Sequence, residues 1–226
     1  MEMITDKDEK RIFWQKLKPM FFPIAFQQLM QSLVSTSDAV MMGLIDQSSL
    51  AAVSLATQVT FVLNLFIWGL SGGGNILAAQ YWGKGSEDDL RQVFSIMLRP
   101  AALVGSLFTV SALIGPEYLM RIYTTDTLLI KLGSEYLRAV SLSYVLTIVT
   151  QCYLCILRNT GRALLASAIS STGVVVNILL NAVLIFGLLG FPALGITGAA
   201  VATVITRIFE LSWAMLEIAK PGRIKP

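Results

Sequence analysis

Histidine is absent from this 226-residue chain, and only 14% of its residues are charged. Without histidine, the chain lacks the commonest general base and metal ligand, and no Ser–His or Cys–His pair is available for nucleophilic catalysis. We therefore expect no enzymatic activity. The two cysteines, Cys152 and Cys155, lie in an apolar stretch rather than in the βαβ context of a redox C-x-x-C motif. We interpret them as packing residues.

Long uncharged runs dominate the rest of the chain, which is 55% hydrophobic with a mean hydropathy of +0.70. Residues 47–83 and 163–206 contain no Asp, Glu, Lys or Arg. Each run exceeds the roughly 20 residues needed to cross a hydrocarbon core of about 30 Å. The sequence therefore predicts an all-α integral membrane protein, a bundle of six transmembrane helices, and a water-soluble fold is excluded.

Charge-poor segments separated by turn residues define the predicted spans. Glycine and proline at 187–195 divide the second uncharged run into a helical hairpin. A cytoplasmic leader at 1–18 and a basic tail or linker at 218–226 flank the bundle, and the longest loop, 115–134, is too short for a catalytic domain. The six spans are 19–43, 50–81, 93–114, 135–157, 163–187 and 195–217.

The distribution of lysine and arginine predicts the orientation. If the N-terminus is cytoplasmic, most basic residues fall on the inner segments, and the outer loops hold only Arg121 and Lys131, with Arg138 near an outer helix end. This asymmetry follows the positive-inside rule. Both termini are therefore expected in the cytoplasm. The inner basic residues are Lys7, Lys10, Arg11, Lys16, Lys18, Lys84, Arg91, Arg158, Arg162, Lys220, Arg223 and Lys225.

Asp38 is the most informative residue, because it lies within the first predicted span. A carboxylate inside a membrane is costly and usually faces a cavity, where it binds a proton or cation. Asp38 follows Gln31 by seven residues, which places both on nearly the same helix face. The alternative is that Asp38 lies among the outer headgroups and is simply solvated.

Asn177 and Asn181 are four residues apart in an otherwise aliphatic run, and Ser170 extends the same face. Two amides there need partners, either from interhelical hydrogen bonds or from a bound ion. Thr203 could add a hydroxyl oxygen, although such residues often bond their own backbone. Together Asp38, Asn177, Asn181 and Thr203 would form a hard oxygen-ligand set suited to Na+.

Span four has a polar stripe at Ser143, Thr147 and Gln151, with Tyr136 two turns earlier. Such a stripe fits either a cavity wall or polar helix packing. We predict that a substrate cleft is lined by Gln31, Asn64, Tyr136 and Gln151.

Other polar features receive simpler interpretations. Pro23 lies inside span one and predicts a kink or hinge. Residues 83–86 lack the full phosphate-loop spacing, so no nucleotide binding is expected. We also expect no nucleic acid as a partner. Lipid headgroups are the default partners for arginines near span ends. The charged residues in or near span ends are Arg99, Arg138, Arg207 and Glu210.

The ordered set of motifs resembles the multidrug and toxic compound extrusion (MATE) family. The resemblance runs along most of the chain and includes Pro23, Gln31 through Asp38, Met42-Gly43, Leu50–Ala56, Ala79–Gly83, Arg158–Gly161, Asn177 through Gly187, Pro192, Gly195, Gly198 and Ala202-Thr203. It implies a polyspecific exporter of small organic, often cationic compounds, driven by Na+ or H+, in a bacterial inner membrane. It also implies that Asp38, Asn177, Asn181 and Thr203 match the first lobe's cation site, and that Gln31 faces the central cleft.

Two departures from the family qualify this expectation. Some relatives have aspartate where this chain has Asn181, so a single monovalent charge suits the site. The second six-helix lobe is missing, so a complete cleft would need that lobe or a second copy of the chain. Beyond the coupling ion, no cofactor is expected. Two alternatives stay open: a flippase of lipid-linked saccharides, which would need buried cations such as Arg99, Arg138 or Arg207, and a truncated lobe that does not transport.

Overall fold

The protein, described here by a computed structural model covering residues 7–219, is helical throughout, with no strand among those residues. Because hydrocarbon offers no partner for backbone N–H and C=O groups, a chain with these apolar runs must satisfy them within helices. The elements are α1 (Lys7–Gly43), α2 (Gln47–Gly83), α3 (Glu87–Ile114), α4 (Pro116–Arg121), α5 (Thr127–Val140), α6 (Leu142–Asn159), α7 (Ala163–Phe186), the 3-10 turn η1 (Leu188–Gly190) and α8 (Gly195–Ala219).

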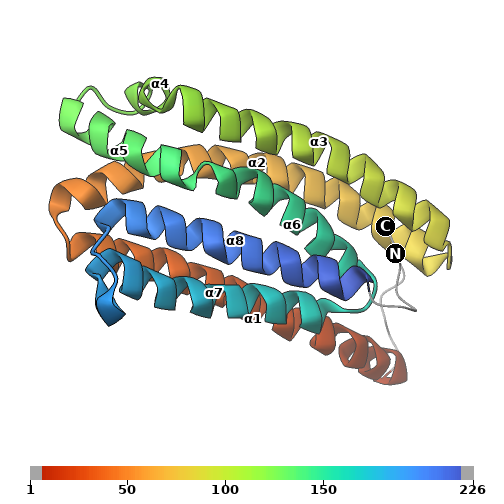
Figure 1. Ribbon diagram of the computed structural model, residues 1–226. Coiled ribbons are helices and arrows are strands. Elements are labelled where there is room, and N and C mark those ends of the chain that lie inside the picture. The colour runs from red at the N-terminus through yellow and green to blue at the C-terminus, as the bar shows by residue number, and fades with distance from the viewer. Residues whose placement is uncertain (1–6, 220–226) are drawn as a thin grey trace.

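The helices make six passes along one long axis, with α5 and α6 together forming the fourth pass (Figure 1). As a result, α1 begins and α8 ends at the same end of the molecule. The predicted leader is described only from Lys7, where α1 starts, and the predicted tail only at its first two residues, where α8 ends. The six-helix bundle predicted from the sequence is confirmed.

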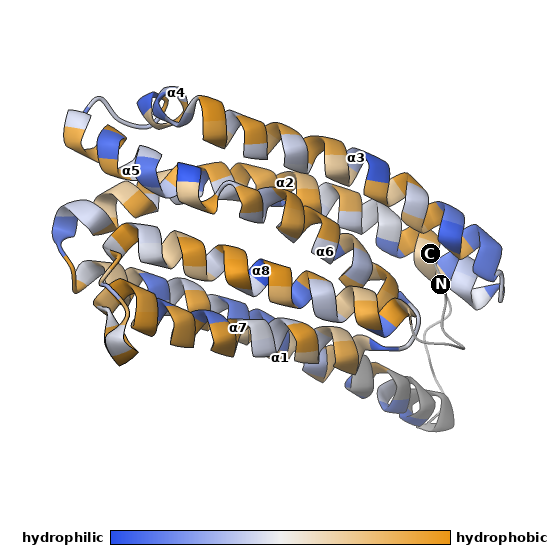
Figure 2. Cartoon of the chain, in the orientation of Figure 1, coloured by the Kyte–Doolittle hydropathy of each residue, from blue (hydrophilic) through white to orange (hydrophobic). Residues whose placement is uncertain are grey.

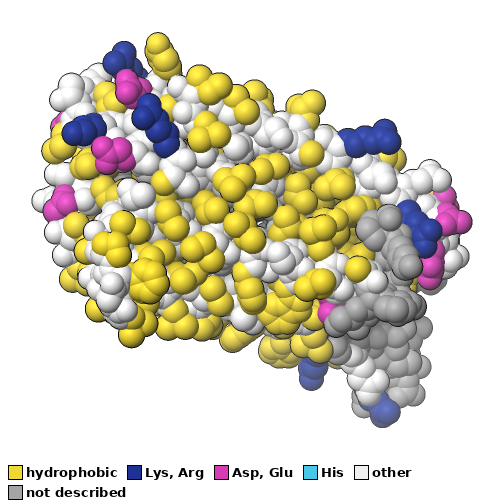
Figure 3. Space-filling view, in the orientation of Figure 1, with side chains coloured by type: hydrophobic (Ala, Val, Ile, Leu, Met, Phe, Trp, Pro, Cys, Tyr) yellow, Lys and Arg dark blue, Asp and Glu magenta, His cyan; other side chains and the backbone are white. Residues whose placement is uncertain are grey.

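Hydrophobic residues predominate in the middle of the molecule, and hydrophilic residues are more frequent toward its two ends (Figure 2). By length and composition, α2, α3, α7 and α8 can each cross a membrane, and the bent pair α5–α6 provides a fifth span. The remaining pass, α1, holds more polar residues. On the face shown in Figure 3, hydrophobic side chains cover the middle, and charged side chains gather mainly near the two ends. This distribution is that of a protein that spans a bilayer.

The fourth pass differs from the single continuous helix expected at 135–157. The chain breaks at Ser141, and α5 and α6 are bent by 48°. The Ser141 hydroxyl donates to the Arg138 carbonyl at 2.8 Å, and Thr109 Oγ1 of α3 donates to the Ser141 carbonyl at 3.0 Å. These two hydrogen bonds take the place of helical backbone hydrogen bonds that are lost at the break. The sequence has no Gly or Pro at this point, so it gave no signal for a break.

The loop expected at 115–134 is also partly helical. It contains the short helix α4 and the first half of α5. Asp126 caps α5, because its Oδ1 accepts hydrogen bonds from the backbone N–H groups of Leu128 and Leu129 at 2.8 and 3.3 Å. An aspartate at this position satisfies two of the free donors of a helix start.

The hairpin predicted between the last two helices is confirmed. Gly187 ends α7 in the left-handed conformation (φ 70°), and the Leu194 amide donates to the Leu184 carbonyl at 2.9 Å across the turn. Gly198 of α8 lies directly against α7, where a Cβ would be 2.6 Å from the Leu184 carbonyl oxygen. Glycine at that point allows the two backbones to approach closely.

Helices α1 and α7 pack parallel to each other. Three hydrogen bonds join them: Ser167 Oγ donates to the Pro23 carbonyl at 2.7 Å, Gln27 Nε2 donates to Ser170 Oγ at 3.0 Å, and Asn181 Nδ2 donates to Asp38 Oδ1 at 2.6 Å. The sequence separations are 144, 143 and 143 residues, and a nearly constant offset requires parallel chains. Helix α1 is continuous across Pro23, so the hinge stays a prediction.

Candidate functional site

Asp38, Asn181 and Asn177 form a hydrogen-bonded row between α1 and α7. Asn181 Nδ2 donates to Asp38 Oδ1 at 2.6 Å and to Asn177 Oδ1 at 3.1 Å. Both asparagines are buried, and Asp38 is partly buried. The two acceptors use both hydrogens of Nδ2, which fixes the orientation of the Asn181 amide. The structure thus brings together the acid and the two amides singled out in the sequence, and their role as ligands stays a prediction.

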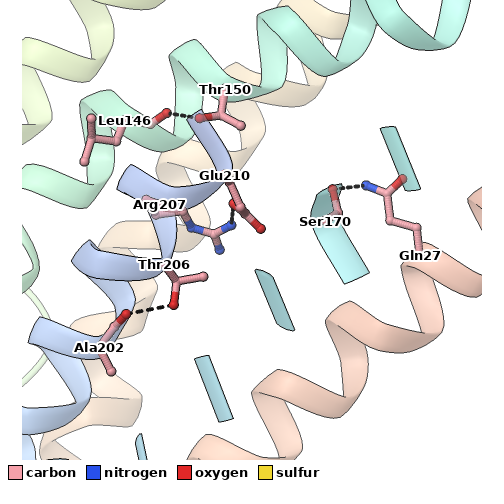
Figure 4. A network of polar contacts seen from close by, with 8 residues as sticks. All are labelled: Gln27, Leu146, Thr150, Ser170, Ala202, Thr206, Arg207 and Glu210. Carbon is pink, nitrogen blue, oxygen red and sulfur yellow. Dashed lines mark hydrogen bonds and ion pairs between the residues drawn. The ribbon is translucent and has the colours of Figure 1, made fainter. Parts of the chain in front are cut away.

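The local sequence of α7 accounts for this row. Gly173, Asn177 and Asn181 are spaced by four residues and are all buried, so they lie on one face of the helix, one turn apart. Ser170 continues this face and accepts the hydrogen bond from Gln27 (Figure 4). The polar groups of an aliphatic helix are therefore gathered on the side that faces α1.

This face borders a polar cavity of about 250 Å³. Its walls include all but Asn181 of the eight residues predicted for the cation site and the substrate cleft, which leaves seven: Gln31, Asp38, Asn64, Tyr136, Gln151, Asn177 and Thr203. Asn181 adjoins the cavity through Asp38 and Asn177. The polar stripe of the fourth pass also reaches it, through Ser143 and Thr147.

Thr203 lines the same cavity from α8. Its Oγ1 donates to the Ala199 carbonyl at 3.0 Å within its own helix, which is the bond to its own backbone that was the alternative to a ligand role. Donation uses the hydroxyl hydrogen and leaves the oxygen lone pairs available. Thr203 therefore shares the cavity with Asp38 and Asn177, with no hydrogen bond to either.

A second, larger cavity of about 680 Å³ adjoins the first. Four side chains line both cavities: Gln31, Ser35, Asn64 and Gln151. The second cavity is rich in amides, with Gln27, Gln28 and Asn75 in its wall, and it also includes the indole of Trp68. Its volume falls within the roughly 300–1,000 Å³ typical of sites for drug-sized ligands, whereas the first cavity is smaller than that range.

The prediction for Arg207 was wrong, and no role was predicted for its partner Glu210. Arg207 was expected to extend to lipid headgroups, but its Nη1 donates to Glu210 Oε2 at 2.6 Å, and both side chains line the first cavity (Figure 4). Their exposed fractions are 22% and 3%. The available signal was the spacing: opposite charges at i and i+3 on an apolar helix can pair with each other.

The chemistry of the cavity suits a hard monovalent cation or a proton rather than a transition metal. Its oxygens come from carboxylate, amide and hydroxyl groups, which are hard ligands. Among the side chains that the structure describes, no cluster of three or more from His, Cys, Asp or Glu is placed to hold a metal ion.

An apolar helical bundle with a buried polar cavity defines this chain as a polytopic membrane protein. The MatE family model matches residues 23–183. The chain belongs to this family, whose members are transporters and not enzymes. The resemblance found in the sequence is thereby confirmed.

Two curated relatives are bacterial. The chain is 28% identical over 219 residues to the probable multidrug resistance protein YoeA of Bacillus subtilis, covering 96% of this chain and 47% of the relative. It is 31% identical over 180 residues to the probable multidrug resistance protein NorM of Rhizobium meliloti, covering 80% of this chain and 38% of the relative. The chain thus spans about half the length, or less, of these curated relatives.

The fold is also that of a solved transporter. A multidrug resistance MATE family transporter of the MOP superfamily, in an outward-facing conformation, superposes with a TM-score of 0.80 at 24% identity. The match covers 91% of this chain and 45% of that one. The bundle described above therefore corresponds to one lobe of that architecture.

Proposed function

We propose that this chain forms one lobe of a cation-coupled exporter of small organic, often cationic compounds, with Na+ or H+ bound at Asp38. The observation that carries the proposal is the 2.6 Å hydrogen bond from Asn181 to Asp38 beside a polar cavity inside an apolar bundle. A carboxylate in such a place needs a positive partner. Arg207 is already paired with Glu210, so an ion from solution is left to fill that role.

The amide of Asn181 supports this assignment. Its Oδ1 is buried and accepts no hydrogen bond from any residue that the structure describes. A buried acceptor without a partner costs about 1–3 kcal/mol. A cation bound beside Asp38 would supply that partner, with Asn177 and Thr203 contributing further oxygens.

The two adjoining cavities support a division of roles. The smaller one holds Asp38 and suits an ion, and the larger one has the volume for a drug-sized cargo. Since Gln31 and Gln151 belong to both walls, a shift of α1 or α6 caused by the ion changes the cargo cavity as well. Alternating access then requires that the ion bind the inward-facing and outward-facing states with different affinities, and Pro23 is the proposed hinge of α1.

A complete transporter needs a second six-helix lobe, supplied either by another segment or by a second copy of this chain. The half-length coverage of the relatives supports this requirement. We place the protein in a bacterial inner membrane with both chain termini in the cytoplasm. The basic turns at Lys84, Arg158 and Arg162 support that orientation.

The three arginines named for the flippase alternative do not meet its requirement. A site for a bulky anionic lipid needs buried unpaired cations, but Arg207 is neutralised by Glu210. The other two candidates, Arg99 and Arg138, are exposed.

Asp38→Asn tests the proposal. The purified wild-type chain should bind Na+, or take up a proton, in a way that the variant does not, measured by ²²Na+ binding and by proton release on ligand addition. A complete transporter with Asp38→Asn should be expressed normally and should lose ion-coupled efflux. The matched control is Asp46→Asn, which removes an exposed acid outside the cavity. Unchanged efflux in the Asp38 variant would refute the coupling site, and a wild-type chain that binds neither ion favours a lobe that does not transport.

A further inference from the structure

The Arg207–Glu210 ion pair is unusual because both charges come from the same apolar helix, α8. Both side chains lie on the side of α8 that faces the inside of the bundle. Glu210 is almost completely buried, and the guanidinium of Arg207 is only partly exposed toward the cavity. Taking two charges out of water costs several kcal/mol per ion, and well-packed apolar residues of similar volume are often at least as stable. Stability alone is therefore a poor account of this pair.

The neighbouring helix is shaped to accept Glu210. A Cβ at Gly173 of α7 would collide with Glu210 Oε1 and would lie 2.8 Å from its Cδ. Only glycine at 173 leaves room for the carboxylate in this position. Because Gly173, Asn177 and Asn181 share one face of α7, the second carboxylate of the cavity lies one helical turn from Asn177 and two turns from the amide that binds Asp38.

The charges of the cavity can be counted from its walls. Its described ionisable side chains are Asp38, Glu210, Arg207, Tyr136 and Tyr144. The tyrosines are uncharged at neutral pH, and a guanidinium does not lose its proton in a protein. Two negative groups and one permanent positive group leave a net charge of −1. Without Arg207, the same cavity would have a net charge of −2.

We propose that Arg207 is a fixed countercharge that limits the Asp38 cavity to one mobile monovalent cation. This inference rests on the proposed cation site. Arg207 keeps Glu210 permanently neutralised, so that only Asp38 calls for an ion from solution. It also lines the same cavity as Asp38, so an Arg207 without Glu210 would compete with the ion for Asp38.

Charge-changing variants separate this role from a structural one. Glu210→Gln leaves the guanidinium unpaired, and the affinity of the Asp38 site for the coupling ion should fall at least about tenfold. Arg207→Gln leaves two carboxylates unpaired, and the chain should bind one more positive charge. The double variant restores the net charge of −1, so its ion count should return to one, with an affinity within about threefold of the wild type. These factors correspond to roughly 1.4 kcal/mol per tenfold change.

The measurement counts bound charges on the purified full chain. Bound ²²Na+ per chain at pH 8 and protons taken up between pH 8 and pH 5 are each compared with Asp38→Asn. Arg207→Lys keeps the positive charge, so this variant should still bind one ion per chain. Arg91→Gln is the matched control, because it removes the same charge from an exposed i, i+3 pair with Asp88 on α3 and should change nothing.

The outcomes are distinguishable. If all four Arg207 and Glu210 variants bind one ion with wild-type affinity and differ only in thermal stability, the pair is structural and the inference is overturned. If the double variant fails to recover the wild-type count while remaining folded, charge balance is also rejected. If the wild type itself shows no Asp38-dependent ion binding, the proposed function and this inference are both wrong.

Discussion

Asp38 and Asn181 meet at 2.6 Å although 143 residues separate them in the chain. The same Nδ2 group holds Asn177 at 3.1 Å, so a single amide joins the acid of α1 to the polar face of α7. The hydrogen bond therefore fixes the carboxylate in the wall of the cavity, where its second oxygen is left for a ligand.

Two replacements of Asn181 should change ion binding in opposite directions: Asn181→Ala should weaken it, and Asn181→Asp should add one bound charge. Asn181→Ala removes a hydrogen bond to a charged group, worth about 1.5–3 kcal/mol, together with a candidate oxygen ligand, and we expect the affinity for the coupling ion to fall at least about tenfold. Asn181→Asp places a second carboxylate beside Asp38. Two acids so close cannot both stay charged without compensation, so the chain should bind one additional positive charge.

Ion binding by the purified chain checks both variants. Gln58→Ala, which changes an exposed amide on α2 outside both cavities, is the control and should bind as the wild type does. An Asn181→Ala chain with unaltered affinity would show that Asp38 does not depend on this contact.

Gly198→Ala should destabilise the bundle. The added methyl group would lie 2.6 Å from the Leu184 carbonyl oxygen and 2.8 Å from its carbon, which are backbone atoms that cannot rotate away. We expect a loss of about 1–3 kcal/mol, as for other overpacked contacts. Thermal unfolding in detergent measures it.

Gly69→Ala is the matched control for that change. It lies in α2 and its Cβ would meet nothing within 4 Å, so the substitution should leave stability unchanged or raise it by up to about 1 kcal/mol, the difference between the helix propensities of the two residues. Equal effects at both glycines would contradict the close α7–α8 approach.

The stability of the start of α2 should depend on pH in the acid range, because Asp46, in the turn after α1, caps that helix. Its carboxylate accepts hydrogen bonds from the Ser49 hydroxyl and from the Ser49 amide, the latter at 2.7 Å. These bonds hold the pKa of Asp46 below its ordinary value of 3.8. A lowered pKa means that the stabilisation is fully present above pH 3.8 and is lost as the pH falls through the pKa of the folded state.

Asp46→Asn tests this dependence, since asparagine also caps helices but does not titrate. The melting temperatures of the wild type and the variant, measured in detergent from pH 7 downward, should converge or cross below pH 3.8. Curves that stay parallel throughout would remove the role assigned to Asp46.

The sequence determined the membrane bundle and the most conspicuous members of its site. Uncharged runs such as 163–206 are longer than a bilayer core is thick, and only helices satisfy their backbone in hydrocarbon. Asp38, Asn177 and Asn181 were found because a polar group inside a predicted span must have a partner. The four-residue spacing of the two amides also placed them on one face before any neighbour was known.

The tertiary structure alone decided which neighbours those groups have. At the break, Thr109 of another helix donates to the Ser141 carbonyl, and the side chain of Glu210 occupies the space left by the missing side chain of Gly173. An arginine on a membrane helix can extend to headgroups or turn inward, and the helix sequence is compatible with both. The choice lies in the shape of the facing helix, because a buried charge is tolerated only where space and a partner of opposite sign coincide.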